Sequence, residues 1–311
     1  MINSHIRDKK LISVNSTPVF PISLGGAGLG SCKENIFFEG PVSEKQAVET
    51  VLFALDNGIN LIDTSPFYGD SETKIGIALQ EYGKRSSIVL STKVGTHPQY
   101  KGYTPDKILR SIENSLKTLQ TDYLDILHIH DPSDINLQSI MKNGTIEALL
   151  RLKEEKVILN LGLGVRDHQL HFQFISSGYA DVILPYLDYN LLRTDAGNLL
   201  EKAYQEKVSV MLGSALCMGL LSGNDPSQIN IRHYNIEQDV SIKKSQQMYD
   251  WCKQNNVDLM ALNYQFILTH PAVNTIIVGA SSKEEVQKSL HAYNEPVNPK
   301  IMNSFLKQFN F

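Results

Sequence analysis

The feature of this 311-residue chain that most limits its fold is a regular alternation of two kinds of segment. Eight times, a short apolar run is followed by turn residues and then by a segment with apolar residues at helical spacing. Several of the runs are almost continuous in Val, Ile and Leu, as expected for parallel strands buried on both faces. The predicted strands are residues 22–28, 60–65, 87–94, 123–131, 159–165, 181–187, 208–215 and 273–280.

The segments between these strands carry helix signals. In 104–120, Thr104 stands at the N-cap position and Pro105 at the first helical position, and apolar residues recur three and four apart. Gly58 is placed to end the first helix. The other predicted helices are residues 43–58, 143–156, 197–207, 241–256 and 282–293, with an extra helix over 257–270 before the last strand.

Eight strands that alternate with helices predict one α/β domain over residues 1–311, a (β/α)8 TIM barrel. The alternative, a doubly wound sheet, would need a phosphate-binding G-x-G-x-x-G turn, which neither 25–30 nor 162–167 matches. Residues 10–21 suggest an N-terminal β-hairpin that covers the barrel floor. Long loops after the first, third and seventh strands (29–41, 95–103 and 216–240) should shape a site at the C-terminal face.

Composition excludes several classes of function. A net charge of −4 offers no basic surface for nucleic acid or anionic membranes. Cys32, Cys217 and Cys252 are odd in number and far apart, which argues against a disulfide framework and fits a reducing compartment. No apolar run is long enough for a signal peptide or a membrane span, so we expect a cytoplasmic protein.

Ionisable residues end three successive apolar strands. The second strand ends in Asp63, with Tyr68 in the loop that follows, the third ends in Lys93, and the fourth ends in His130 after His128. Neighbouring strands lie about 4.8 Å apart, so these side chains can meet over one barrel mouth, where barrel enzymes place catalysis. Lys93 needs a counter-ion, which Asp63 provides, and a lysine beside Tyr68 should lower the pKa of that phenol.

Each of these residues alone has a structural explanation: an ion pair, a core histidine, a packed tyrosine. Their joint occurrence at the same end of consecutive strands favours a catalytic site. The segments LIDTSPFYGDSETKIGIAL, STKVG, DYLDILHIHDP and TIIVGASSKEEVQKSL together resemble the aldo-keto reductase family over almost the whole chain. GLGVRD and GSALCMGLLSG are most similar to the branch that contains L-galactose, L-fucose and D-threo-aldose dehydrogenases and a pyridoxal dehydrogenase.

The resemblance implies a nicotinamide cofactor that lies extended across the barrel top, with hydride passing between its C4 atom and the substrate carbon. It implies that Tyr68 exchanges a proton with the substrate oxygen, that Lys93 stabilises the phenolate, and that Asp63 holds Lys93. His130 is expected to hydrogen-bond the substrate oxygen and orient it.

The cofactor positions depart from the commoner pattern of the family. Gly164 and Val165 stand where many relatives carry Ser-Asn, Tyr186 stands in place of a Gln, and Gly213 with Ser214 in place of a stacking Tyr. The residues expected to bind the cofactor are Gly26, Ala27, Gly164, Tyr186, Ser214, Leu216, Gly279, Ala280, Ser281, Ser282 and Glu285.

Cofactor choice depends on the last strand and helix. Where NADPH-specific relatives place Lys and Arg, this chain has Gly279 and Glu285, and a glutamate should repel a 2′-phosphate. We therefore expect NAD as the preferred cofactor, with NADP possible because Lys283 is near and Glu285 is also typical of a solvated first helical turn.

NAD favours oxidation, so the predicted reaction converts an aldose to its lactone with hydride transfer to NAD. Pyridoxal dehydrogenation and general NADPH-dependent reduction of aldehydes or ketones are the alternatives. The substrate is a small molecule, a sugar or an aldehyde, and its expected contacts are Phe37, His97, Asp131 and Tyr189. The sequence leaves open whether the protein is a monomer or a dimer.

Two rival classes are weighed against this. His128-x-His130 is a zinc-ligand pattern of hydrolase barrels, but later strands offer no further His, so no metal is expected. A non-catalytic cofactor-binding regulatory protein could keep the same fold, yet all four catalytic positions are intact.

Overall fold

The structure is a computed structural model that describes residues 18–31, 42–229 and 238–311. In this part of the chain, eight parallel strands close into a barrel in sequence order, so the predicted (β/α)8 barrel is confirmed. Each strand lies within one residue of its predicted run. The strands are β1 (Ile22–Gly25), β2 (Leu61–Asp63), β3 (Val89–Val94), β4 (Leu124–His130), β5 (Ile158–Gly164), β6 (Val182–Leu184), β7 (Ser209–Gly213) and β8 (Val273–Gly279).

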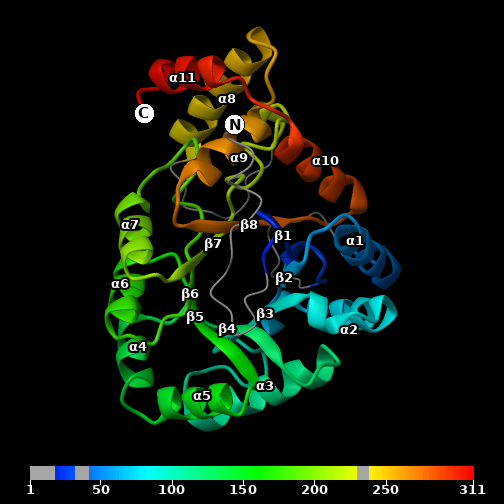
Figure 1. Ribbon diagram of the computed structural model, residues 1–311, viewed down its shortest axis with the longest axis vertical. Helices are drawn as coiled ribbons and strands as arrows, with labels where there is room; N and C mark the ends of the chain where they lie inside the picture. The colour runs from blue at the N-terminus through cyan, green and yellow to red at the C-terminus, as the bar shows by residue number, and fades with distance from the viewer. Residues whose placement is uncertain (1–17, 32–41, 230–237) are drawn as a thin grey trace.

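Helices surround the ring of strands (Figure 1). They are α1 (Glu44–Asp56), α2 (Ser71–Tyr82), α3 (Pro105–Thr118), α4 (Asp134–Ile140), α5 (Thr145–Glu154), α6 (His168–Ser176), α7 (Gly197–Gln205), α8 (Gln238–Gln254), α9 (Leu259–Thr269), α10 (Lys283–Asn294) and α11 (Pro299–Gln308). Short 3-10 turns are η1 (Gly26–Gly28), η2 (Pro66–Tyr68), η3 (Arg85–Ser87) and η4 (Pro226–Gln228). The extra helix before the last strand is α9, while α2, α4, α6 and α11 add to the predicted set.

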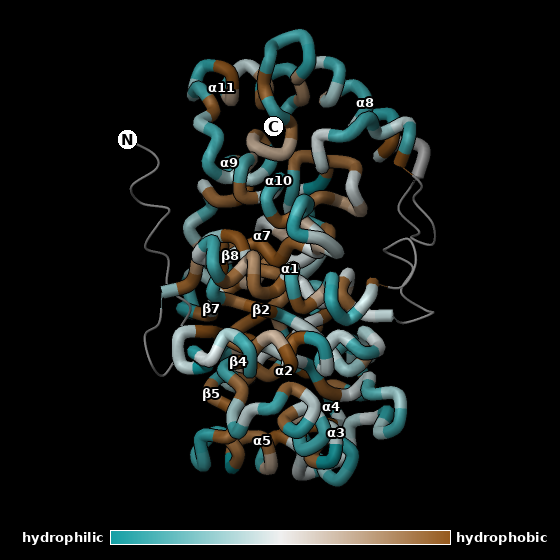
Figure 2. Tube along the Cα trace, turned by 90° about the vertical axis from the view of Figure 1, so that its right-hand side faces the viewer, coloured by the Kyte–Doolittle hydropathy of each residue, from teal (hydrophilic) through white to brown (hydrophobic). Residues whose placement is uncertain are grey.

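Apolar side chains fill two regions. The larger core lies between the strands and the helices, and a smaller cluster that includes Leu61, Val89, Ile126 and Met211 fills the barrel interior. Figure 2 shows hydrophobic residues concentrated along the central strands. Val19 is buried in the interior cluster. The rest of the predicted N-terminal hairpin, residues 10–17, lies outside the described residues.

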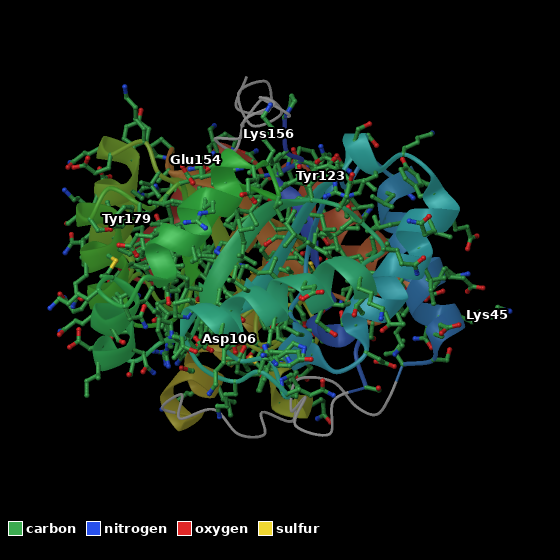
Figure 3. The ribbon with its side chains drawn as sticks, turned by 90° about the horizontal axis from the view of Figure 1, so that it is seen from below. Lys45, Asp106, Tyr123, Glu154, Lys156 and Tyr179 are labelled. Atoms are coloured by element: carbon green, nitrogen blue, oxygen red, sulfur yellow. The ribbon has the colours of Figure 1, made fainter. Side chains whose placement is uncertain are left out.

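The strands all point the same way, so their carboxyl ends form one mouth. In Figure 3 the barrel is seen from the side, with Tyr123, which precedes β4, near one edge and Asp106, in the first turn of α3, near the other. The mouth is on the side of Asp106, where β3 has ended and α3 begins. Among the described residues, no helix combines the length and the apolar character that crossing a bilayer demands.

Candidate active site

Three of the predicted catalytic residues share the inner face of the barrel. Asp63 pairs in register with Ser91, Lys93 with His128, and His130 with Gly164, and register partners on parallel strands point to the same side. Asp63, Lys93 and His130 are each less than 10% exposed. The structure therefore brings their side chains together beneath one end of the barrel.

Lys93 is the centre of this group. Its ammonium donates to Asp63 Oδ2 at 2.5 Å and to the Thr64 carbonyl at 2.7 Å, and it also lies beside the Tyr68 phenol. Burial alone would lower the pKa of Lys93, but the charge of Asp63 and the contact with Tyr68 raise it above its ordinary value. Ser91 Oγ occupies Asp63 Oδ1 at 2.7 Å, so the carboxylate is held at both oxygens.

Tyr68 lies in η2, which follows β2. Ser65 Oγ caps this turn by accepting from the Phe67 amide, and the chain then turns at Gly69, which has a φ of +66°. The Lys93 Nζ atom lies 4.9 Å from the centre of the Tyr68 ring. Our expectation of a lowered phenol pKa was wrong. Burial raises the pKa of Tyr68, and this outweighs the opposing effect of Lys93, so the phenol keeps its proton at neutral pH.

His130 is held in one orientation. Its Nδ1 atom lies 2.7 Å from Thr96 Oγ1, and its Nε2 atom lies 3.5 Å from Asp131 Oδ2. Burial, then the nearby charge of Lys93, lower its pKa well below the ordinary range, so the ring is neutral and its tautomer matters. If Thr96 donates to Nδ1, Nε2 carries the proton and can donate to a substrate oxygen. Thr96 could not be singled out from the sequence, because a loop threonine is unremarkable by itself.

A second residue that sequence reasoning missed is Glu72, in the first turn of α2. Its carboxyl oxygens accept from Thr92 Oγ1 at 2.6 Å and from Ser115 Oγ at 3.2 Å, which joins α2 to β3 and α3. Burial raises the pKa of Glu72 to about 7 despite both hydrogen bonds and the charge of Lys93. These hydrogen bonds fix the start of α2, which directly follows the loop that carries Tyr68.

Four strand ends at the mouth are bare backbone. The inward-facing end positions of β1, β5, β7 and β8 are glycine, namely Gly25, Gly164, Gly213 and Gly279. A Cβ atom at Gly213 would lie 3.0 Å from the Cβ of Tyr186, whose side chain uses that space. The space left over these four glycines, beside a cluster of proton-transfer groups, fits a flat ring such as nicotinamide.

The loop after β7 has an unusual backbone that suits a binding role. Ser214, Cys217 and Met218 have φ values of +52°, +47° and +59°, although none is glycine. Such strained turns persist where the surroundings hold them and often mark ligand sites. The predicted contacts Ser214 and Leu216 lie in this loop, and Gly26 and Ala27 lie in η1, which follows β1 on the far side of β8.

The amino end of α10 also lies at the mouth, directly after β8. Ser282 is the N-cap, and its hydroxyl accepts from the Glu285 amide at 3.3 Å. Glu285 Oε2 in turn accepts from the Ser281 amide at 2.7 Å and from Ser281 Oγ at 2.9 Å. The carboxylate thus occupies two donors that an incoming phosphate group would use. Gly279 and Ala280 lead into this turn.

The predicted substrate residues separate into different places. Asp131 lies at the mouth beside His130, whereas Phe37 lies outside the described residues. Both ring nitrogens of His97 are engaged, Nδ1 by the Gln99 and Tyr100 amides and Nε2 by the Asn114 side chain. His97 therefore organises the loop after β3, and both of its ring nitrogens already have partners within the protein.

Tyr189 likewise has its contacts within the protein. Its ring stacks on Phe266 of α9 at 5.5 Å and meets His270 edge-on at 5.4 Å, so it packs against the outer helices. Asp188, the residue before Tyr189, forms an ion pair that the sequence did not predict. Arg166, just beyond β5, binds Asp188 through Nε and Nη2 at 2.9–3.3 Å, which joins the loops after β5 and β6.

In the described part of the chain, no group of three His, Cys, Asp or Glu is placed to hold a metal ion. His128 lies one layer below His130 and is fully buried, with its ring over Gly162. Burial, with the charge of Lys93, lowers its pKa well below the ordinary range, so it stays neutral.

Comparison with known proteins gives this geometry its context. The sequence profile of the "Aldo/keto reductase family" matches residues 21–307. This chain belongs to the aldo/keto reductase family. The L-galactose dehydrogenase of Arabidopsis thaliana is 32% identical over 283 residues, which span 89% of this chain and 85% of that protein. The D-threo-aldose 1-dehydrogenase of a Pseudomonas species is 24% identical, over 86% of this chain and 89% of that protein.

A solved structure, the glycerol dehydrogenase from Gluconobacter oxydans, superposes with a TM-score of 0.77 at 23% identity, covering 98% of this chain and 96% of that one. The likeness agrees with the barrel described above. As a member of the aldo/keto reductase family, this protein is an NAD(P)-dependent oxidoreductase. The predicted branch is confirmed by its relatives, which include both aldose dehydrogenases.

Proposed function

We propose that this aldo-keto reductase oxidises an aldose to its lactone with NAD. The observation that carries the proposal is a buried lysine placed between a carboxylate and a phenol. Lys93 contacts Asp63 and Tyr68 at once, next to the neutral ring of His130. A phenol, an ammonium and a neutral imidazole around one point can bind a carbonyl or hydroxyl oxygen and move its proton.

In this reaction the substrate C1 carbon loses a hydride and its hydroxyl oxygen loses a proton. The bare strand ends at Gly164 and Gly213 would hold a nicotinamide, which would supply the hydride acceptor. Tyr68 first loses its own proton to solvent, Lys93 stabilises the resulting phenolate, and Tyr68 Oη then takes the proton of the substrate hydroxyl. His130 Nε2 holds the C1 oxygen while the C–O single bond becomes the carbonyl of the lactone. In reduction, Tyr68 gives its proton to the carbonyl oxygen.

Two features support NAD as the preferred cofactor. Glu285 already holds the Ser281 amide and hydroxyl, and its negative charge opposes a 2′-phosphate at that place. Gly279 supplies no basic side chain at the end of β8. Because the cellular NAD pool is mostly oxidised, an enzyme with this preference works as a dehydrogenase.

The aldose is favoured by two observations. The relatives above are named for oxidation of aldoses, and Asp131 puts a hydrogen-bond acceptor beside His130, where a sugar hydroxyl can donate to it. We also propose that the enzyme works in the cytoplasm, because Cys217 and Cys252 are both buried free thiols.

The test is a turnover panel with NAD and NADP separately, using aldoses, pyridoxal and simple aldehydes, followed by identification of the product by NMR. Lactone formation from an aldose, with NAD preferred, is the expected result. Preferential oxidation of pyridoxal would move the substrate within the same branch. NADPH-dependent reduction of simple aldehydes alone would contradict both the direction and the cofactor that we propose.

A further inference from the structure

Asp131 has a built position at the mouth. It directly follows β4 with a φ of +42°, a left-handed conformation that few residues other than glycine adopt. Its amide donates to the Gly164 carbonyl at 2.9 Å, which ties this turn to the end of β5. The backbone thus aims one particular side chain over the barrel at the cost of local strain.

Tyr186 holds the Asp131 carboxylate from the other side of β5. Its hydroxyl donates to Asp131 Oδ1 at 3.2 Å. The reach of Tyr186 depends on Gly213 of the next strand, because a Cβ atom there would approach the Tyr186 Cβ to 3.0 Å. One carboxylate oxygen is therefore occupied and the side chain is oriented.

The second oxygen faces the catalytic histidine. Asp131 Oδ2 lies 3.5 Å from His130 Nε2, the atom that holds the reacting oxygen of the substrate, and the Asp131 side chain is 43% exposed. The charge of Asp131 also contributes to the raised pKa of Tyr68, so it lies within electrostatic reach of the phenol. Two oxygens on adjacent carbons of a substrate are about one hydrogen-bond length apart, so the second would meet Oδ2.

We propose that the Asp131–Tyr186 pair selects substrates that carry a hydroxyl group on the carbon next to the reacting one. This deepens the proposed function, on which it rests, by naming the class of substrate: 2-hydroxy carbonyl compounds and the aldoses among them. A carboxylate accepts hydrogen bonds but donates none. A 2-hydroxyl satisfies it, whereas an alkyl group in the same place removes water from Oδ2 and offers nothing in return.

The expected discrimination follows from the charge on the acceptor. Sites built to hydrogen-bond a hydroxyl reject analogues that lack it, and hydrogen bonds to charged groups contribute enough for a preference of roughly 10- to 100-fold in kcat/KM. Lactaldehyde and 2-methylpropanal are a matched pair for this measurement, because a methyl group replaces the hydroxyl at nearly constant shape.

The experiment compares kcat/KM for reduction of these two aldehydes by the wild type and by three variants. Asp131→Asn keeps the shape but removes the charge. Tyr186→Phe keeps the ring but removes the hydrogen bond. Asp134→Asn removes the same charge from the first turn of α4, where Asp134 binds Gln138 and Gln173, and serves as the control.

The wild type and Asp134→Asn should prefer lactaldehyde at least 10-fold, Asp131→Asn should lose most of that preference, and Tyr186→Phe should lose part of it. An equal preference in the wild type and Asp131→Asn would overturn the proposal, as would a wild type that does not discriminate. The same ratio is measured in oxidation, with galactose and its 2-deoxy counterpart. A wild type that turns over neither aldehyde and neither sugar would also overturn the proposal.

The two proposals fail separately in this design. A wild type that reduces lactaldehyde with the predicted selectivity but oxidises no aldose refutes the proposed function and leaves the role of Asp131 standing. A wild type that oxidises aldoses and their 2-deoxy counterparts equally well does the reverse.

Discussion

The cofactor preference can be changed at one exposed residue, Glu285. In Glu285→Gln the carboxylate charge disappears while the side chain keeps its length and can still accept from the Ser281 amide and hydroxyl. In Glu285→Arg a positive charge replaces it. We expect both variants to use NADP better relative to NAD, and the arginine variant to show the larger change.

The size of the effect comes from Coulomb's law. A carboxylate about 5 Å from a 2′-phosphate dianion is repelled by about 1.5 kcal/mol in water, which corresponds to roughly 10-fold in the NADP-to-NAD ratio of kcat/KM. At physiological salt, where the screening length is about 8 Å, the effect falls to a few-fold. Changing repulsion to attraction in Glu285→Arg doubles the free energy, so roughly 100-fold is expected at low salt.

The assay measures kcat/KM for NAD and NADP with one aldose at two ionic strengths. Glu284→Gln is the matched control, because Glu284 is the other acidic residue in the first turn of α10. A shift in Glu285→Gln that shrinks with salt and is absent in Glu284→Gln supports the reasoning. An unchanged ratio, or an equal shift in both variants, would show that Glu285 does not face the adenosine ribose.

Three further predictions concern the proton-transfer site and the buried Glu72 next to it. Tyr68→Phe should reduce turnover by roughly 10²- to 10⁴-fold, with cofactor binding retained in an NADH fluorescence titration. Because burial raises the pKa of Tyr68, the rate of oxidation by the wild type should increase with pH into the alkaline range, while the rate of reduction stays flat near neutrality. Thr96→Val should lower kcat roughly 10-fold, because the hydroxyl that fixes the tautomer of His130 is lost. Thr96→Ser keeps the hydroxyl and should keep the wild-type kcat, and equal rates in the two variants would argue against this role. The pKa of Glu72 is raised from 4.5 to about 7, so between these pH values the folded state binds more protons than the unfolded state. The contribution of Glu72 to the free energy of unfolding therefore falls as pH rises, by about 3 kcal/mol in total. Urea unfolding of Glu72→Gln should lack that decline, and a pH dependence identical to that of the wild type would contradict the burial argument.

The barrel could be predicted from the sequence because strands buried on both faces must be apolar for most of their length. That requirement makes exceptions visible. Asp63, Lys93 and His130 stand out because each interrupts an apolar run at its carboxyl end, and strand register then brings them together.

The rest depends on which side chains meet in space. His97 and Asp131 are both polar residues after strand ends. The nitrogens of His97 are used by its own loop and by Asn114 of α3, whereas Asp131 Oδ2 faces His130 at the mouth. The pKa of Tyr68 was misjudged because the effect of a nearby lysine can be read from strand order, whereas the depth of burial cannot. Thr96 gains its role only through its 2.7 Å contact with His130.

The central claim is that the cluster of Asp63, Tyr68, Lys93 and His130 oxidises a sugar with NAD. The most direct test follows the near-ultraviolet absorbance of reduced nicotinamide after wild-type protein is mixed with NAD and an aldose such as L-galactose, D-arabinose or L-fucose, with Tyr68→Phe alongside. We predict a steady rise for the wild type with at least one aldose, and a rise at least roughly 100-fold slower for the variant. No rise with any aldose, or an equal rise in Tyr68→Phe, would contradict the claim.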